Sequence, residues 1–199
     1  MDNQPITLTG QLIRLEPLSE AHVPHLVVAG RDEVIWQYML YGNATTEAKM
    51  QKLVQKMLQL QAQGADLPFA VIHLASGRAI GMTRYAYMRP EHRGLEIGGT
   101  WYGVAYQRTA VNTECKYLML RHAFEVWHCI RVQFTADGRN ERSQKALERL
   151  GAVKEGRFRH HFILPDGFIR DSVYYSITDS EWPPIKARLE ANLEREGRE

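Results

Sequence analysis

The chain has 199 residues, of which 44% are hydrophobic, so it is long enough to form one domain with a core of its own. Its 25 basic and 23 acidic residues give a formal net charge of +2, and both signs are intermixed along the chain. This balance argues against nucleic acid or an anionic membrane surface as the main partner. We therefore expect a single domain over residues 1–199.

The first ten residues are polar, and no apolar run approaches the roughly 18 residues that a membrane-spanning helix needs. The two cysteines, Cys115 and Cys129, are too few for a disulfide framework and fit a reducing compartment. We therefore expect a cytoplasmic protein in which both are small core residues. A nucleophilic Cys115 is the alternative, because the first turn of a helix lowers the pKa of a thiol.

Hydrophobic periodicity and turn signals divide the chain into alternating strands and helices. In the first part of the chain, we predict a strand over 6–18, a short helix from Ser19 to Gly30, an aromatic-rich loop over 31–45 and a helix from about Thr46 to Gln63. Strands over 67–74, 79–88 and 95–106 follow, and then a helix over 115–127 and a strand over 130–136. The last elements are a helix from near Asn140 to Gly151, a hairpin over 156–177 that turns at Pro165–Gly167, and a terminal helix over about 183–196.

The stretch from Leu95 to Phe124 organises the rest, because a strand there turns sharply into a helix. Such a turn directs unpaired backbone N–H groups and the positive end of the helix dipole toward one point. The connecting segment carries the donors Gln107, Arg108, Asn112 and Thr113, with no carboxylate before Glu114. A phosphate or diphosphate group is therefore the expected ligand of this turn.

Three segments in order resemble the GNAT superfamily of acetyl-CoA-dependent N-acetyltransferases. They are the turn "QRTAVNTE", the segment "IRVQFTADGRNERSQKALERLGA" and the hairpin "GRFRHHFILPDGFIRDSVYYSI". The resemblance runs from Ile6 to about Trp182, and within the superfamily it is to the branch typified by ribosomal-protein alanine N-acetyltransferases. The turn alone is a weak signal, because loops that cradle phosphate recur on unrelated folds.

The resemblance implies an α+β fold. Its mixed, mostly antiparallel sheet of about seven strands is splayed at an acetyl-CoA slot and carries helices on both faces. It also implies a transferase that passes the acetyl group of acetyl-CoA to a primary amine, by direct attack in a ternary complex. The acceptor is a protein N-terminus or a small-molecule amine. The alternative is a coenzyme A-binding sensor or partner-binding module with little catalysis.

By this resemblance the slot lies between the strand ending near Tyr102 and the strand beginning at Ile130. The expected contacts to acetyl-CoA are Trp101, Tyr102, Gly103, Gln107, Arg108, Thr109, Ala110, Val111, Asn112, Thr113, Asn140 and Ser143.

Two small residues of the family's diphosphate turn are replaced here, by Ala110 and Asn112. If Ala110 needs a positive φ, its Cβ costs about 1 kcal/mol. Asn112 is expected to compensate as the N-cap of the helix. We therefore expect weaker coenzyme A binding rather than its loss.

Glu96 and Ser143 are the catalytic candidates. The resemblance makes Ser143 the donor to the leaving sulfur, since Leu147 stands where many relatives have a tyrosine; the alternative is that Ser143 only caps the helix. Glu96 is the candidate general base. Its spacing to Gln107 is one residue longer than usual, so Glu96 points away from the cleft unless a bulge absorbs the extra residue. A solvated surface glutamate is the alternative.

The remaining expectations concern the acceptor, metals and assembly. Trp36, Tyr38, Tyr85, His160 and His161 are expected to line the acceptor pocket. No metal is expected, because the histidines lack a cysteine or carboxylate cluster at ligand spacing. The buried side of the terminal helix is expected to pack on this domain or on a second subunit, which leaves a homodimer open.

Overall fold

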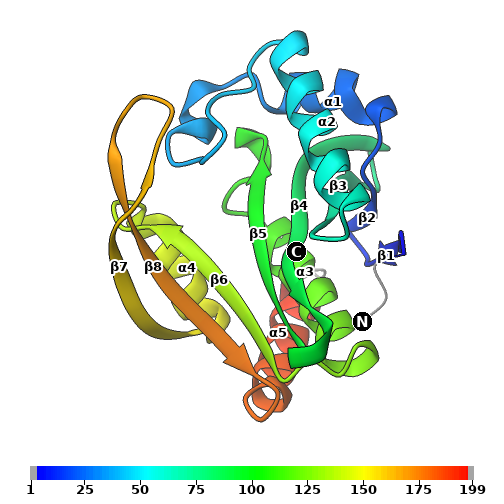
Figure 1. The fold of residues 1–199 in the computed structure, drawn as a ribbon. Coiled ribbons are helices and arrows are strands. Elements are labelled where there is room, and N and C mark those ends of the chain that lie inside the picture. Colours follow the sequence, from blue (N-terminus) through cyan, green and yellow to red (C-terminus); the bar gives the residue numbers. More distant parts are fainter. Residues whose placement is uncertain (1–3, 197–199) are drawn as a thin grey trace.

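The computed structural model describes residues 4–196, which form one open sheet of eight strands with helices on both faces (Figure 1). Neighbours in the sheet follow the order β1-β2-β3-β4-β5-β6-β8-β7. Each neighbouring pair is antiparallel except β5 and β6, which are parallel. The strands are β1 (Leu8–Thr9), β2 (Ile13–Pro17), β3 (Leu67–His73), β4 (Arg78–Arg89), β5 (Gly94–Tyr102), β6 (Arg131–Asp137), β7 (Val153–Ile163) and β8 (Ile169–Thr178).

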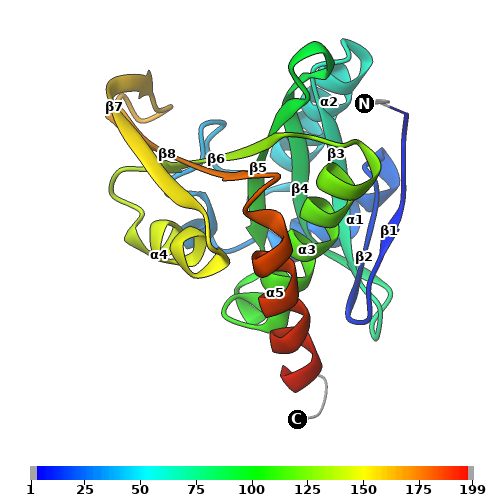
Figure 2. The same cartoon turned by 90° about the horizontal axis from the view of Figure 1, so that it is seen from below.

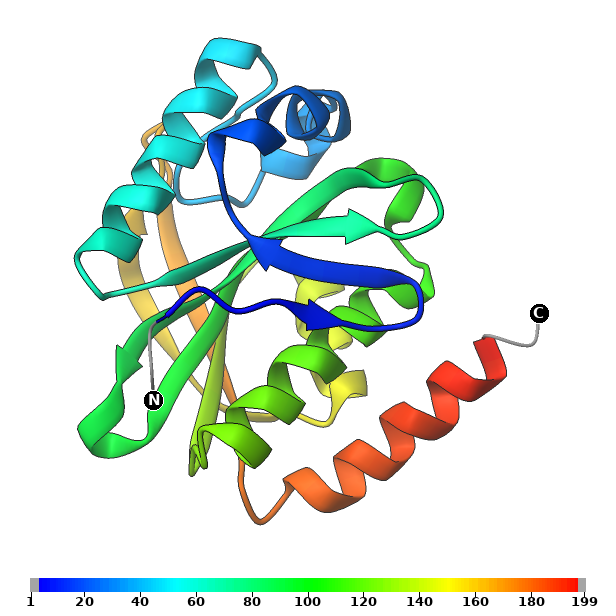
Figure 3. The ribbon, with the colours of Figure 1, turned by 90° about the vertical axis from the view of Figure 1, so that its right-hand side faces the viewer.

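Two groups of helices cover the sheet. Helices α1 and α2 lie on one face, whereas α3, α4 and α5 lie on the other (Figures 2 and 3). The helices are α1 (Val23–Ala29), α2 (Glu47–Ala62), α3 (Ala110–Arg121), α4 (Glu141–Leu150) and α5 (Trp182–Glu196), with short turns η1 (Glu20–His22), η2 (Glu33–Trp36), η3 (Pro90–His92), η4 (Val104–Tyr106) and the π-helical η5 (His122–Val126). Within residues 4–196, no helix combines the length and the apolar character that crossing a bilayer demands.

The predicted α+β architecture, with a mixed and mostly antiparallel sheet, is confirmed. The eighth strand arises because the segment predicted as one strand over 6–18 is divided. The Gly10 N–H donates to the Ile13 carbonyl at 2.9 Å, which closes a turn between β1 and β2. Capping residues set several helix ends as predicted. The side chains of Thr46 and Asn140 cap α2 and α4, and Gly151 ends α4 with φ of 96°.

The core is divided by the sheet into two apolar layers. The layer under α3 and α5 includes Ile97, Met119 and Phe134, whereas the layer under α1 and α2 includes Met50 and Trp101. Helix α5 packs on this domain rather than leaving its apolar side free. Residues Trp182, Ile185 and Leu189 of α5 are buried, and the Trp182 ring stacks on Phe124 at 5.5 Å.

The carboxylate of Glu114 ties α3 to the turn between β1 and β2. Glu114 is buried, and its two oxygens accept hydrogen bonds from the backbone N–H groups of Gln11, Leu12 and Ile13 at 2.7, 2.9 and 2.8 Å. A Cβ at Gly10 would lie 2.4 Å from the carboxylate carbon, so the turn needs glycine there. These bonds fix one edge of the sheet to the helix whose N-terminus borders the site.

Replacing Glu114 by glutamine leaves at least one of the three backbone N–H groups without an acceptor and removes a buried charge. We expect the free energy of unfolding at neutral pH to fall by about 2 kcal/mol, measured by urea denaturation. The exposed Glu91→Gln variant is the matched control and should change it by less than about 0.5 kcal/mol. Equal stability of the two variants would contradict the proposed tie.

Candidate active site

The parallel strands β5 and β6 separate soon after they begin. They pair over only three residues of β5, from Gly94 to Glu96. Beyond that point β5 runs to Tyr102 and β6 to Asp137 with no ladder between them, and Figure 1 shows the two strands diverging. Their facing backbone groups are therefore left for another partner. The gap lies where the sequence predicts it, between the strand ending near Tyr102 and the strand beginning at Ile130.

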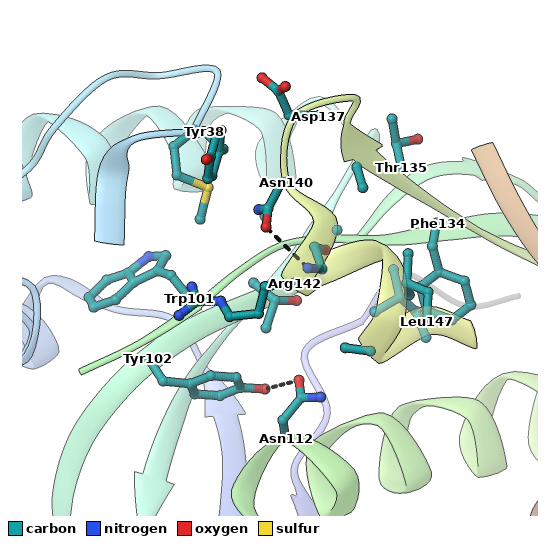
Figure 4. Close-up of a pocket in the computed structure, with 18 of the residues that line it drawn as sticks. Tyr38, Trp101, Tyr102, Asn112, Phe134, Thr135, Asp137, Asn140, Arg142 and Leu147 are labelled. Atoms are coloured by element: carbon teal, nitrogen blue, oxygen red, sulfur yellow. Dashed lines mark hydrogen bonds between the residues drawn. The ribbon is translucent and has the colours of Figure 1, made fainter. Parts of the chain in front are cut away.

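A cavity of about 580 Å³ occupies this gap and reaches both faces of the sheet (Figure 4). One end lies at the N-termini of α3 and α4, and the other lies beside the loop between η2 and α2. Of the residues expected to contact acetyl-CoA, those that line the cavity are Trp101, Tyr102, Gln107, Arg108, Thr109, Asn112, Thr113, Asn140 and Ser143. The gap thus brings together groups from β5, α3 and α4.

Three of the residues expected to contact acetyl-CoA do not line this cavity. Val111 is 4% exposed and belongs to the core, which is where its apolar side chain is most stable. The Gly103 N–H donates to the Ile80 carbonyl at 2.8 Å, so β4 already uses this donor. Ala110 begins α3 and contributes no wall of the cavity.

Glu96 lies at the point where the two strands separate. It is 8% exposed and lines the cavity. Its Oε2 accepts hydrogen bonds from Gln133 Nε2 at 3.0 Å and Thr135 Oγ1 at 2.9 Å, whereas no described residue bonds Oε1. A Cβ at Gly98 would lie 2.9 Å from Oε1, so glycine leaves room for the carboxylate. Glu96 is therefore held by one oxygen and keeps the other for a ligand.

A β-bulge explains why Glu96 faces the cavity despite its long spacing to Gln107. Two residues of β5, Gly99 and Thr100, lie opposite the single residue Thr83 of β4. Gly99 has a φ of 60°, which glycine adopts without the penalty of a Cβ. The bulge absorbs the extra residue, so the surface alternative for Glu96 is wrong.

The turn before α3 differs from the expectation in two respects. Thr109, not Asn112, is the N-cap, and its Oγ1 accepts from the Val111 N–H at 3.3 Å. Asn112 lies further along, inside the first turn of α3, and accepts from the Tyr102 hydroxyl at 3.3 Å (Figure 4). The positive φ of the turn falls on Arg108, at 62°, so Ala110 carries none of the conformational cost considered for it.

The end of the cavity at α3 is rich in positive charge and in donors. Arg108 and Arg142 line it beside the helix N-terminus, where the first backbone N–H groups are free of helical partners. Gln107 braces this end, because its Nε2 donates to the Tyr102 carbonyl at 3.1 Å and its Oε1 accepts from Arg142 at 2.7 Å. This donor set fits the diphosphate of acetyl-CoA.

The start of α4 contributes the second catalytic candidate. Asn140 Oδ1 accepts from the Ser143 N–H at 3.1 Å and is the N-cap of α4 (Figure 4). The Ser143 hydroxyl makes no hydrogen bond to any described residue, and Ser143 lines the cavity. The capping alternative for Ser143 is therefore wrong, since Asn140 performs that function. Leu147 is buried on the same helix face and gives the cavity an apolar wall.

The other end of the cavity is aromatic. Tyr38 lines it as expected, next to Tyr41, whose hydroxyl donates to the Gly99 carbonyl at 3.3 Å. Burial raises the pKa of Tyr41 to about 12, so it stays a neutral donor. The Arg139 guanidinium lies 3.5 Å from the Phe168 ring centroid and 5.5 Å from that of Tyr38. These cation–π contacts join the loop to the tip of the β7–β8 hairpin.

Two aromatic residues expected in the acceptor pocket are placed in the core instead. Tyr85 is fully buried and donates to the Met119 carbonyl at 2.7 Å, on the α3 side of the sheet. Trp36 is 4% exposed and donates to the Gly30 carbonyl at 2.8 Å. Its ring packs 4.8 Å from Trp101, so it supports the cavity wall from behind. The physical reason is burial, because large rings with one satisfied polar atom stabilise a core.

The two histidines of β7 lie beside the cavity rather than in it. A register irregularity between Phe158 and Phe162 lifts this part of the strand, and His160 has a φ of 50°. His160 and His161 line a separate surface hollow, whereas Phe162 reaches the main cavity. Burial, and then the nearby Arg170 guanidinium, lower the pKa of His161. The acceptor role expected of His160 and His161 stays a prediction, and Phe162 is the residue of this segment that lines the main cavity.

Sequence reasoning missed several cavity residues. Arg170 is 4% exposed, and its Nε has no hydrogen-bond partner among the described residues. This atom lies 3.9 Å from an Asp137 carboxylate oxygen, and burial lowers the pKa of Arg170. Tyr174 and Lys116 also line the cavity. No local sequence motif identifies these three residues as cavity residues. Whether their side chains face the cavity depends on the register and packing of their strand or helix.

Both cysteines are buried core residues, as expected. Burial raises the pKa of the Cys115 thiol and raises that of Cys129 to about 11. This outweighs the helix-dipole effect that would favour a Cys115 thiolate, so the nucleophilic alternative for Cys115 is wrong. Within residues 4–196, no three His, Cys, Asp or Glu side chains are placed to hold a metal ion.

Comparisons with known proteins agree with this geometry. Residues 13–153 match the family model described as "Acetyltransferase (GNAT) domain". A provisionally assigned acetyltransferase from T. thermophilus is 40% identical, with a TM-score of 0.88 over 97% of this chain and 100% of that one.

Two curated relatives are also similar. The provisionally named ribosomal N-acetyltransferase YdaF of Bacillus subtilis (strain 168) is 22% identical over 84% of this chain and 90% of its own length. The [ribosomal protein uS5]-alanine N-acetyltransferase of Escherichia coli (strain K12) is 31% identical over 46% of this chain and 44% of its own length. The chain thus belongs to the GNAT family of acetyltransferases, which use acetyl-CoA as co-substrate.

Proposed function

We propose that this acetyltransferase acetylates a primary amine by direct attack within a ternary complex. The observation that carries this is one continuous cavity in the strand gap. It runs from the cationic N-terminus of α3 to the carboxylate of Glu96. Such a cavity holds donor and acceptor together, and the buried Cys115 thiol is held in its protonated form, which disfavours a covalent intermediate. Acetyl-CoA supplies the acetyl group as an activated thioester.

Glu96 is the proposed general base. Its Oε2 is held by Gln133 and Thr135, which fixes the carboxylate, and Oε1 is left to accept a proton from the amine directly or through water. The position at the separation of β5 and β6 supports this role. The backbones of β5 and β6 stop pairing at Glu96, so a ligand that lies in the gap can reach its carboxylate.

Ser143 is the proposed donor to the leaving sulfur. Its backbone is fixed by the Asn140 cap, and its hydroxyl is free of other described partners and lines the cavity. A hydroxyl held in this way stabilises a thiolate as it forms. Leu147, one helical turn further, offers no hydrogen bond and leaves this task to Ser143.

The acceptor class is inferred from the relatives. Two curated relatives carry names that specify ribosomal-protein or ribosomal N-acetyl transfer, and one name specifies an alanine acceptor. The α-amine of a protein N-terminus is therefore the first acceptor to test, with small-molecule amines second. Three residues favour the sensor alternative: Ala110, Asn112 and Leu147. The first two count less, because Ala110 takes no positive φ and Thr109 rather than Asn112 caps α3.

The first prediction is acetyl transfer itself. With acetyl-CoA and a panel of amines and N-terminal peptides, we expect continuous release of free thiol that depends on an acceptor, detected with a thiol reagent. Mass spectrometry should show the mass increase of one acetyl group on the amine that reacts. Tight acetyl-CoA binding in calorimetry without thiol release for any acceptor would favour the sensor instead.

Replacing Glu96 by glutamine keeps the size of the side chain and one hydrogen-bond acceptor but removes its basicity. We expect kcat/KM for the acceptor to fall about 100-fold, with acetyl-CoA affinity nearly unchanged, measured by steady-state kinetics and calorimetry. The exposed Glu91→Gln variant is the matched control and should retain full activity. A Glu96→Gln enzyme with normal kcat/KM would remove Glu96 from the mechanism.

Replacing Ser143 by alanine removes the hydroxyl and leaves intact the hydrogen bond from the backbone N–H of residue 143 to Asn140 Oδ1. We expect kcat to fall about tenfold or more while the Kd for acetyl-CoA stays the same, because the bond forms mainly in the transition state. Ser76→Ala, in the exposed turn between β3 and β4, is the control. Unchanged turnover in Ser143→Ala would show that another group or water serves the sulfur.

A further inference from the structure

Lys116 is a buried cation on the cavity side of α3. It is 6% exposed and is one of the residues that line the cavity in the strand gap. Lysine side chains are almost never buried to this extent unless a counter-charge or a full set of acceptors compensates the loss of water. The mechanism proposed above gives Lys116 no task, so its position needs a separate explanation.

The described part of the chain gives Lys116 no counter-charge. Neither Asp nor Glu forms an ion pair with it among residues 4–196, whereas the buried carboxylate of Asp66 is paired with Arg84 at 2.8 Å. Glu114, two residues before it in sequence, is fully engaged with the backbone of the β1–β2 turn. Burial accordingly lowers the pKa of Lys116, and the neighbouring Cys115 opposes this effect only in part.

The ammonium group also has unused donors. Lys116 Nζ donates to Thr100 Oγ1 at 2.7 Å, and this is its single hydrogen bond to a described residue. The Thr100 hydroxyl lies 2.8 Å from that of Thr83, which in turn donates to Met119 Sδ at 3.5 Å. With Thr83 donating to sulfur, the Thr100 proton must point to Thr83, and Thr100 accepts from Lys116. Two N–H donors of the ammonium therefore remain for the cavity.

The position of Lys116 along the cavity follows from two contacts between α3 and β5. Asn112 is bonded to Tyr102, and Lys116, four residues later, is bonded to Thr100, two residues earlier in the strand. Four residues of a helix rise about 6 Å, and two residues of a strand span about 6.6 Å. The two contacts therefore advance by nearly the same distance, as expected where α3 and β5 run side by side in opposite directions. Lys116 thus lies one turn beyond Asn112, in the direction of Glu96.

We propose that Lys116 donates a charge-assisted hydrogen bond to a carbonyl oxygen of the pantetheine–thioester arm of acetyl-CoA. This rests on the proposed binding of acetyl-CoA in the strand gap. The diphosphate is expected at the helix N-terminus and the thioester near Glu96, so the ligand group that passes Lys116 is the arm between them. The arm carries amide and thioester carbonyl oxygens, which are the acceptors that the unused N–H donors lack. Lys116 is thus a binding residue for the arm.

The test compares the whole ligand with its nucleotide end. Calorimetry measures the Kd of acetyl-CoA and of adenosine 3′,5′-diphosphate, which lacks the arm, for the wild-type chain and for Lys116→Met. We expect the variant to bind acetyl-CoA about tenfold or more weakly, as for loss of a hydrogen bond from a charged donor, and to bind the nucleotide as well as the wild type does. Lys56→Met, exposed on α2, is the control and should match the wild type for both ligands.

Folding does not limit the test, because the substitution exchanges an unpaired buried charge for an apolar side chain of similar length. Circular dichroism confirms the fold, and Lys116→Leu, which also has no N–H donor in its side chain, provides a second variant expected to show the same selective loss. Equal affinity for acetyl-CoA in wild type and Lys116→Met would overturn the proposal, as would an equal loss for both ligands. A covalent acetyl adduct on Lys116 after incubation with acetyl-CoA would also overturn it. Failure of the wild type to bind acetyl-CoA would instead refute the proposed function.

Discussion

The structure depends on the early separation of the parallel strands β5 and β6. A parallel pair that continued past Glu96 would consume the backbone groups of both strands and close the sheet. Beyond Glu96 the two strands follow different partners: β5 stays paired with β4 and carries the Gly99–Thr100 bulge, which bends and twists a strand, while β6 stays paired with β8 along its whole length. The cost is a row of unpaired backbone N–H and C=O groups along the gap. An extended ligand that lies between the strands can form hydrogen bonds with these groups.

The same bulge sets the direction of the side chains around the gap. Leu95 and Ile97 face the α3 layer, so Glu96 faces the other side, toward the cavity. Trp101 lies five residues after Glu96, yet it also faces the α1 and α2 layer, because the bulge adds one residue to the alternation. One extra residue in β5 therefore places the carboxylate and the indole on one wall, and Thr100 on the opposite face beside Lys116.

These facts explain how much the sequence predicts. Local signals are sufficient for the helix ends at Thr46, Asn140 and Gly151 and for the strand that turns into α3, because caps and glycines act within a few residues. They are insufficient for Tyr85, which was expected in the pocket but faces the core, since its direction depends on the register of β4 with two neighbours. The N-cap of α3 was mispredicted for a related reason, as Thr109 and Asn112 are both good caps by residue type.

Charge along the cavity follows from the same geometry. Arg108 and Arg142 lie at the N-terminus of α3, Lys116 lies one turn beyond Asn112, and the carboxylate of Glu96 lies where β5 and β6 separate. Leu147 and Phe134 form an apolar part of the cavity wall, and charges beside such a wall are screened less than charges in bulk water. A ligand that is anionic at one end and meets an amine at the other is favoured in a single orientation. The splayed strands therefore provide the space, and the order of charges within it provides the direction.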